Sequence, residues 1–159
     1  MPPESPLPRL SLVIPAYNEE RFLPRLLDSI DAASHRYAHG TAAVEIIVAD
    51  NASTDRTAEL ARARGCRVVP VAKRSIAAAR NAGGAAAHGE FVGFVDADMR
   101  IHPDTFDAIE RARAFLLILS EKANDSPFVN NEVNRAFAQR KSIFTFRVED
   151  MRPSGSLEV

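Results

Sequence analysis

Two aspartates stand one residue apart directly after an apolar segment of the chain. Asp96 and Asp98 follow Phe91–Val95, whose apolar run predicts a buried strand. The carboxyl ends of parallel strands are where open α/β sheets bind ligands. Two carboxylates at such a place repel each other, and a bound cation removes the repulsion. Oxygen ligands suit Mg²⁺ or Mn²⁺, which commonly bind together with phosphate groups. The alternative is that both aspartates only cap the next helix.

More polar residues follow two other apolar segments. Leu10–Pro15 and Val44–Ala49 each read as a buried strand, and an amide and an acidic residue come soon after each. Right-handed crossovers bring the loops after parallel strands to one edge of a sheet. So many groups at one edge exceed what helix capping needs, and the pattern favours a ligand or metal site. The residues in question are Asn18, Glu19, Asp50, Asn51, Asp96 and Asp98.

The elements that must position these residues alternate between strand and helix, with short loops between them. This alternation predicts an α/β fold with a mostly parallel sheet and helices on both faces, as in Rossmann-like proteins. Ser53 or Thr54 is the predicted cap of the second helix, and Gly65 ends it. The predicted strands are 10–15, 44–49, 67–71 and 91–95, and the predicted helices begin near 18, 55, 75 and 102.

Length and composition are those of one ordinary globular domain. The chain has 159 residues, of which 46% are hydrophobic and 26% are charged. A net charge of −1 gives no basic surface, so nucleic acid is excluded as a partner. Cys66 is the only cysteine, which excludes an internal disulfide and fits a reducing compartment. No segment reads as a signal peptide or as a transmembrane segment. We expect a cytoplasmic protein, and peripheral contact with a membrane is left open.

Four motifs follow one another along residues 10–106. They are Val13–Glu19, Ile46–Asp55, Ala79–Gly83 with Gly89 and Glu90 after it, and Asp96–Asp98. In this order they resemble the nucleotide-binding half of the family 2 glycosyltransferases, which have the GT-A fold. Many relatives carry an aspartate and a glycine where this chain has Asn51 and Ala52. The resemblance implies a nucleotide-sugar donor linked to UDP or GDP, a divalent metal (Mn or Mg) as cofactor, and transfer of the sugar to an unknown acceptor.

The resemblance also implies roles for single residues. Asp50 would accept hydrogen bonds from the base or the ribose, and Arg80 would approach the diphosphate or brace the acidic loop. Asp98 would hold the metal ion, which neutralises charge on the departing nucleoside diphosphate. Glu19 has the alternative role of capping its helix. The implied nucleotide-binding residues are Pro15, Ala16, Tyr17, Glu19, Asp50, Arg80 and Asp96, and the metal ligands are Asp98 and Asp96.

The back of the chain carries a second resemblance. Ala112–Ser120, Ser126–Val133 and Phe146–Asp150 resemble the C-terminal half of a bacterial TIR domain, over about residues 108–158. Strands are predicted at 115–119 and 142–148, and a helix at 126–140. Glu132 matches the glutamate that NAD-cleaving TIR enzymes require, and its alternative role is that of an exposed helical carboxylate. The sequence therefore predicts a lead-in at 1–9, a GT-A-like half-domain at 10–107 and a TIR-like half-domain at 108–159. Extension of the first half-domain's sheet by the TIR-like strands is left open.

Four functions are consistent with these motifs. The first is transfer of a sugar from a nucleotide-sugar, although the acceptor half and the catalytic base of a family 2 enzyme are not evident in the sequence. The second is nucleotide-sugar binding without turnover. The third is a TIR-type module for NAD cleavage or TIR–TIR assembly, and the fourth is an inactive fusion. Self-association is left open.

Overall fold

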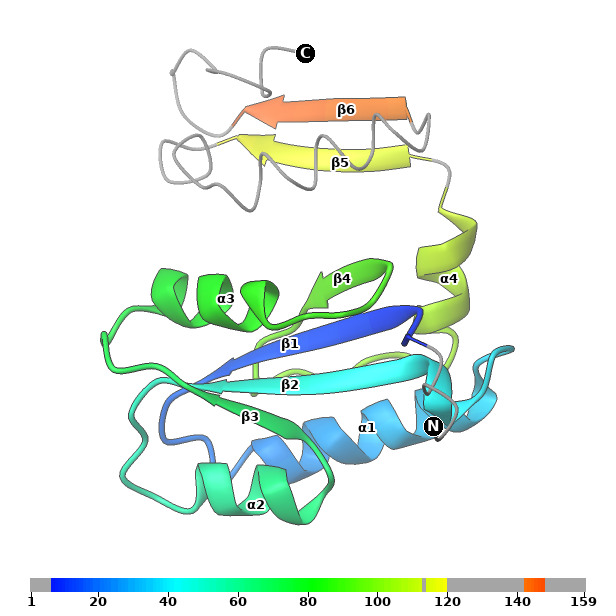
Figure 1. Ribbon diagram of the computed structural model, residues 1–159. Helices are drawn as coiled ribbons and strands as arrows, with labels where there is room; N and C mark the ends of the chain where they lie inside the picture. The colour runs from blue at the N-terminus through cyan, green and yellow to red at the C-terminus, as the bar shows by residue number, and fades with distance from the viewer. Residues whose placement is uncertain (1–6, 113, 120–141, 148–159) are drawn as a thin grey trace, which may run out of the picture. The chain divides into compact units, whose positions relative to one another are not determined.

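The computed structural model describes residues 7–112, 114–119 and 142–147 (Figure 1). The chain divides near residue 109 into two compact units, and each is described by itself. The domain division expected from the sequence, with a boundary at residues 107 and 108, stays a prediction.

The first unit contains a four-stranded parallel sheet. Its strands are β1 (Leu10–Ala16), β2 (Val44–Asp50), β3 (Arg67–Pro70) and β4 (Phe91–Phe94), in the order β3-β2-β1-β4. β1 is buried along its whole length because it has a partner on each side and helices on both faces. Ala16 lies opposite Asp50 at the ends of β1 and β2, so the two strands finish together. The structure confirms the predicted α/β fold.

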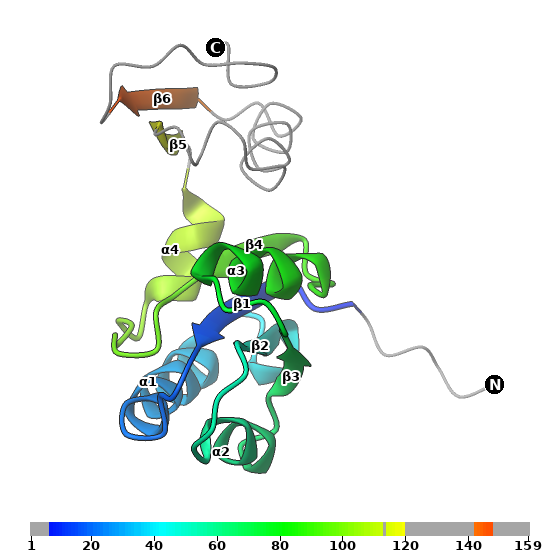
Figure 2. The same ribbon diagram turned by 90° about the vertical axis from the view of Figure 1, so that its left-hand side faces the viewer.

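Helices cover both faces of this sheet. Figures 1 and 2 show α1 and α2 on one face and α3 on the other. The helices are α1 (Leu23–Arg36), α2 (Thr57–Ala63), α3 (Ile76–Ala85) and α4 (Thr105–Arg111), and a short 3₁₀ turn, η1, spans Thr41–Ala43. No helix of the described residues is long and apolar enough to cross a membrane.

Alternate residues of β1 serve the two faces of the sheet. Leu12 and Ile14 belong to the main hydrophobic core, together with Leu26 of α1. Val13 contacts α3, where Gly83 leaves room for it. A Cβ atom on Gly83 would overlap the Cγ1 atom of Val13. Gly83 therefore allows α3 to lie directly on the sheet.

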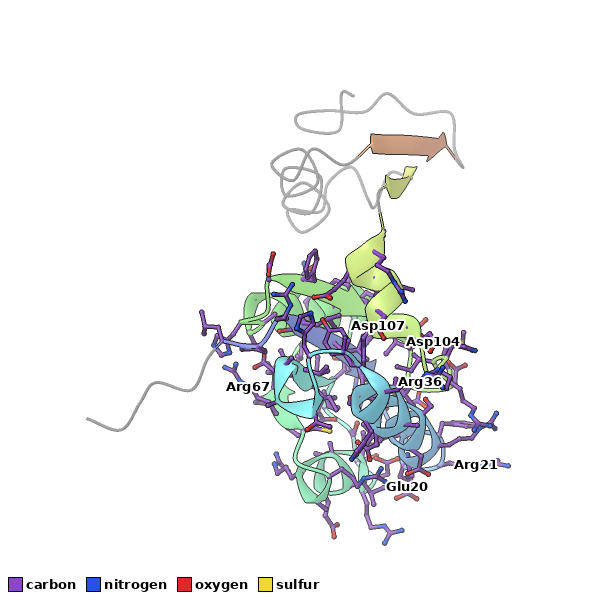
Figure 3. The ribbon with its side chains drawn as sticks, turned by 90° about the vertical axis from the view of Figure 1, so that its right-hand side faces the viewer. Glu20, Arg21, Arg36, Arg67, Asp104 and Asp107 are labelled. Carbon is purple, nitrogen blue, oxygen red and sulfur yellow. The ribbon has the colours of Figure 1, made fainter. Side chains whose placement is uncertain are left out.

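A polar network joins β1, β2 and the loop before β4 at the amino edge of the sheet. The Ser11 hydroxyl donates to Glu45 (2.7 Å) and accepts from the N–H of Gly89 (2.8 Å). The N–H of His88 donates to the same carboxylate (3.0 Å). Arg67, labelled in Figure 3, contributes an ion pair to Glu45 at 3.4 Å. The fully buried Ser11 side chain is thus satisfied in both its roles.

The end of α1 is held against α4. Figure 3 shows Arg36, Asp104 and Asp107 close together, and Arg36 pairs with Asp104 at 2.7 Å. Phe106 of α4 is completely buried, and its ring centroid lies 5.7 Å from that of Tyr37. α4 therefore belongs to the hydrophobic core of the first unit.

Three helices begin later than the sequence predicted, namely α1, α2 and α4, the last of which begins at Thr105. α1 begins at Leu23, and a helix cannot include Asn18 because its φ angle of 56° is left-handed; the backbone N–H groups of residues 18 to 20 donate to Ser53, Thr57 and Asp55. α2 begins at Thr57, and neither Ser53 nor Thr54 caps it. The N-cap residue is Arg56, which makes no side-chain cap, and Asp55 before it accepts from the N–H of Thr57 (2.9 Å).

The second unit is described as two strands. β5 (Ala114–Leu119) and β6 (Ser142–Arg147) pair in parallel, which agrees with the two strands expected there, and form a sheet of their own. The hydrogen-bonded strand order of the four-stranded sheet does not include them, so extension of that sheet by β5 and β6 is not seen. The predicted helix at 126–140, with Glu132, lies outside the described residues.

Candidate functional site

The loops after the four strands meet at the carboxyl edge of the sheet. Strand pairing continues slightly into these loops, since the N–H of Asn51 donates to Ala16 (2.8 Å) and the N–H of Val95 donates to Val13 (3.0 Å). The polar residues that the sequence assigned to one edge therefore do lie at one edge.

The loops after β1 and β2 are joined by reciprocal hydrogen bonds. The N–H of Asn18 donates to the Ser53 hydroxyl (3.0 Å), and the Asn18 side chain accepts from the N–H of Thr54 (2.8 Å). The N–H of Glu20 donates to Asp55 (3.0 Å). Asp55 and Ser53 are thus engaged in holding the two loops together.

The backbone at this edge is strained at two residues. Asn18 has a φ angle of 56° and Ala52 has a φ angle of 58°, both in the left-handed region. Asparagine tolerates this region, whereas alanine does so at a cost of about 1–2 kcal/mol. Such strain is commonly found at binding sites.

An open pocket of ≈ 120 Å³ lies between the loop after β1 and the start of α3. It is smaller than the roughly 300–1,000 Å³ of a typical small-molecule site. Four implied nucleotide-binding residues, Pro15, Ala16, Tyr17 and Glu19, line it. The other lining residues are Asn51, Ile76 and Ala79.

Glu19 connects this pocket to the acidic pair after β4. Its pKa is raised by partial burial and, in decreasing order, by the negative charges of Asp98, Asp55 and Asp96. The pocket and the carboxylates of both aspartates therefore share one region of negative potential. A cation bound there would be stabilised by all of these groups.

The two aspartates have different surroundings. Asp96 accepts from the Arg80 guanidinium at 2.8 Å. Asp98 is exposed, and among the described residues no hydrogen bond or ion pair engages its carboxylate. The Nε atom of Arg80 is buried and lacks a partner in the described part of the chain. Arg80 thus braces the acidic loop, and Asp98 is the more available ligand.

The acidic pair fits a divalent metal that a phosphate helps to hold. Among the described residues no three acidic, histidine or cysteine side chains form a group able to hold a metal ion. Two carboxylates with open positions suit Mg²⁺ or Mn²⁺, which are usually bound by one or two carboxylates together with substrate phosphates and water. A metal on these two carboxylates would need further ligands from a phosphate or from water.

Asp50 does not line the pocket. It ends β2, and its carboxylate accepts from the N–H of Ser53 (3.2 Å). Asn51, the next residue, lines the pocket instead. Ile76 and Ala79 were not predicted for the site, because nothing in an alanine-rich helix shows which face it turns to a ligand.

A basic segment follows β3 at the same edge. The Arg74 guanidinium lies over the Tyr17 ring, 4.9 Å from its centroid. Tyr17 remains 41% exposed, so part of its ring is open to a ligand. Lys73 and Arg74 are the exposed cations of this segment.

Cys66, the one cysteine of the chain, is buried and is not a candidate nucleophile. The pKa of the Cys66 thiol is raised to about 11, mainly by burial. A thiol with such a pKa is protonated at neutral pH and is a poor nucleophile.

The comparisons with known proteins agree with this geometry. The model of the family "Glycosyl transferase family 2" matches residues 11–114, more than half of the chain. An undecaprenyl-phosphate 4-deoxy-4-formamido-L-arabinose transferase of Pseudomonas paraeruginosa is 39% identical over 115 residues, which are 67% of this chain and 33% of that protein. The uncharacterized glycosyltransferase EpsJ of Bacillus subtilis is 33% identical over 97 residues, 58% of this chain and 26% of that protein. This chain thus spans a third or less of the length of these curated relatives.

Two solved structures share the fold of the described unit. Residues 1–349 of S. aureus TarS in complex with UDP-GlcNAc align with a TM-score of 0.57 and 29% identity, over 71% of this chain and 34% of that one. The mannosyltransferase PcManGT of Pyrobaculum calidifontis, in complex with GDP-Man and Mn²⁺, aligns with a TM-score of 0.56 and 25% identity, over 78% of this chain and 39% of that one. These comparisons give no support to the TIR-like resemblance, which stays a prediction.

Proposed function

Because this chain belongs to glycosyl transferase family 2, we propose that its first unit binds a nucleotide-diphosphate sugar at the carboxyl edge of the sheet. The observation that supports this best is the position of Glu19. It lines the pocket, and its pKa is raised by partial burial and by the nearby charges of Asp98, Asp55 and Asp96. An organic ligand in the pocket and a cation on the aspartates would therefore be neighbours, which is what a metal-bound diphosphate requires.

The proposed roles follow from these surroundings. Pro15, Ala16 and Tyr17 offer a mainly apolar wall for the base or the ribose, and Asp50 lies at the end of the neighbouring strand. Arg80 holds Asp96, and its partly exposed guanidinium can also donate to a phosphate oxygen. Further nucleotide contacts are proposed for Glu19 and Asp96.

Asp98, with Asp96 beside it, would hold Mn²⁺ or Mg²⁺. A divalent metal at this place would neutralise the negative charge of a nucleoside diphosphate as it leaves the sugar. The solved relatives with UDP-GlcNAc and with GDP-Man and Mn²⁺ support a donor and a metal of these classes. Transfer of the sugar to an acceptor is proposed for the whole protein from its family.

Metal-dependent nucleotide binding tests the proposal. Calorimetric titration of the purified chain with UDP and GDP, with and without Mn²⁺, is expected to show binding of one nucleotide that requires the metal. Asp98→Ala should weaken it by about 100-fold or more, because losing even an outer partner of a metal ligand costs about 10–100-fold.

Glu90→Ala is the matched control for this experiment. Glu90 directly precedes β4, at the amino edge of the sheet, and its contact is a surface ion pair with Arg9 at 3.9 Å. This variant should bind as the natural chain does. Full affinity in Asp98→Ala, or no metal-dependent binding by the natural chain, would contradict the proposal.

A further inference from the structure

Asn51 is placed between the two sides of the pocket. One side is the loop after β1, with Ala16 and Tyr17, and the other is the start of α3, with Ile76 and Ala79. The backbone N–H of Asn51 donates to the carbonyl of Ala16 (2.8 Å), which ties it to the first side. Asn51 as a whole is 8% exposed, so it is a buried polar residue.

The side-chain amide of Asn51 binds the second side of the pocket, at the start of α3. Oriented so that both of its ends are satisfied, it donates through its nitrogen to the carbonyl of Lys73 (2.7 Å) and accepts through its oxygen from the N–H of Ser75 (3.1 Å). Ser75 begins α3, since its hydroxyl accepts from the N–H of Ala78 (3.4 Å). The amide thus binds the residues on either side of Arg74, namely Lys73 and Ser75, and α3 starts from the second of them.

We propose that Asn51 is a positioning residue for the nucleotide pocket. It sets the separation between the loop after β1 and the start of α3, and it holds residues 73–75 so that Arg74 lies over Tyr17. The inference rests on the proposed function, since the pocket is the one assigned there to the donor. Asn51 acts through this segment and not through direct contact with the reacting atoms.

The two hydrogen bonds to Lys73 and Ser75 explain why position 51 carries an asparagine. The position must donate to a carbonyl and accept from an N–H at the same time, and an amide side chain does both at neutral pH. A carboxylate can accept from Ser75 but has no proton for the carbonyl of Lys73, so the two oxygens would repel each other. Because the site is buried, an unpaired carbonyl there is unfavourable.

The first measurement needs no ligand. In NMR spectra of the natural chain, the Ser75 amide should be protected from hydrogen exchange, and the Arg74 side-chain protons should be shifted upfield by the Tyr17 ring. Asn51→Ala should lose both the protection of the Ser75 amide and the upfield shift of the Arg74 protons. Asn51→Asp should keep the Ser75 protection and lose the Arg74 shift. Tyr17→Leu should lose the Arg74 shift and keep Ser75 protection.

The second measurement is titration of the same variants with UDP or GDP in the presence of Mn²⁺. Asn51→Ala and Asn51→Asp are each expected to bind about tenfold more weakly, which corresponds to loss of one buried hydrogen bond. Ala63→Asp is the control, because Ala63 is the exposed last residue of α2 and does not line the pocket, so this variant adds a charge and should bind as the natural chain does.

The outcomes separate this inference from the proposed function. Unchanged Ser75 and Arg74 signals in Asn51→Ala would overturn it, and so would changed signals with unchanged nucleotide affinity. A natural chain that binds no nucleotide would defeat the proposed function, while the ligand-free spectra would still decide whether Asn51 positions the segment. If Asn51→Ala does not fold, Asn51→Asp gives the test through the Arg74 shift and the nucleotide affinity, and an unchanged Arg74 shift in that variant would overturn the inference.

Discussion

Two residues at the carboxyl edge, Asn18 and Ala52, have backbone conformations that most residues avoid. Ala52 has a left-handed backbone in an exposed loop, where glycine would be free of strain. Asn18 has the same left-handed conformation, but it also forms hydrogen bonds with Ser53 and Thr54 of the loop after β2. The strain at Ala52 is therefore a cost of holding the loop after β2 in its observed shape.

Ala52→Gly should stabilise the chain by roughly 0.5–1 kcal/mol. Glycine relieves about 1–2 kcal/mol of left-handed strain and loses part of this gain to its greater freedom in the unfolded chain. Urea unfolding measures the difference. Ala58→Gly, within α2, is the control and should destabilise by about 0.5–1 kcal/mol. A destabilised Ala52→Gly would show that the loop does not strain this residue.

Glu45 is a second residue whose surroundings decide its behaviour. Burial opposes its ionisation, but hydrogen bonds from Ser11 and from His88 outweigh burial and hold its pKa below 4.5. Because the folded pKa is depressed, this carboxylate stabilises the fold above its unfolded pKa, and the contribution is lost as the pH falls through the folded pKa.

Glu45→Gln should therefore destabilise the chain by about 1–2 kcal/mol at pH 7. The difference from the natural chain should shrink as the pH falls from 5 to 3, where the natural carboxyl becomes protonated. Urea unfolding at a series of pH values tests this. A difference that stays constant over the whole series would mean that the charge of Glu45 is not what stabilises the network.

At the scale of elements, the position of α3 decides the geometry of the pocket. α3 contributes Ile76 and Ala79 to the pocket and Arg80 to the acidic loop. It approaches the sheet closely because Gly83 has no side chain where Val13 contacts it. A packing change at Gly83 is thus transmitted to the site along the helix.

Gly83→Ala should destabilise the chain by about 1–3 kcal/mol, because the added methyl group overlaps Val13. Nucleotide affinity should fall with it, since α3 must move outward. Combining Gly83→Ala with Val13→Ala removes the overlapping Cγ1 atom and should restore part of the stability. A double-mutant cycle measures the coupling. Additive effects of the two changes would contradict the contact.

At the scale of the whole molecule, the first unit has its own hydrophobic core. This core draws on β1, β2, α1 and α2, and it includes Phe106 of α4. The core therefore requires α4 although the chain divides near residue 109, within that helix.

A chain of residues 1–112 should fold cooperatively, whereas a chain of residues 1–103 should not. The shorter chain lacks Phe106, and loss of a buried phenylalanine costs about 3–5 kcal/mol, a large part of the stability of a small domain. Circular dichroism during heating compares the two. Equal unfolding temperatures would show that α4 contributes little to the core.

The sequence by itself determined the sheet and the edge that carries the site. Apolar runs such as Leu10–Pro15 are buried wherever they lie, and polar residues at the end of one parallel strand must lie near those of the next. The strands, the fold class and the family could thus be predicted from local patterns. The roles assigned to single site residues stay predictions.

Only the tertiary structure decided which of those polar residues have partners. Asp96 is bound by Arg80, and Asp55 accepts from the N–H of Glu20 and so joins the loops after β1 and β2. Asn51, and not Asp50, lines the pocket. These pairings join residues that are distant in the sequence, and no local pattern specifies them. They depend on the separation and register of strands and helices, which packing alone establishes.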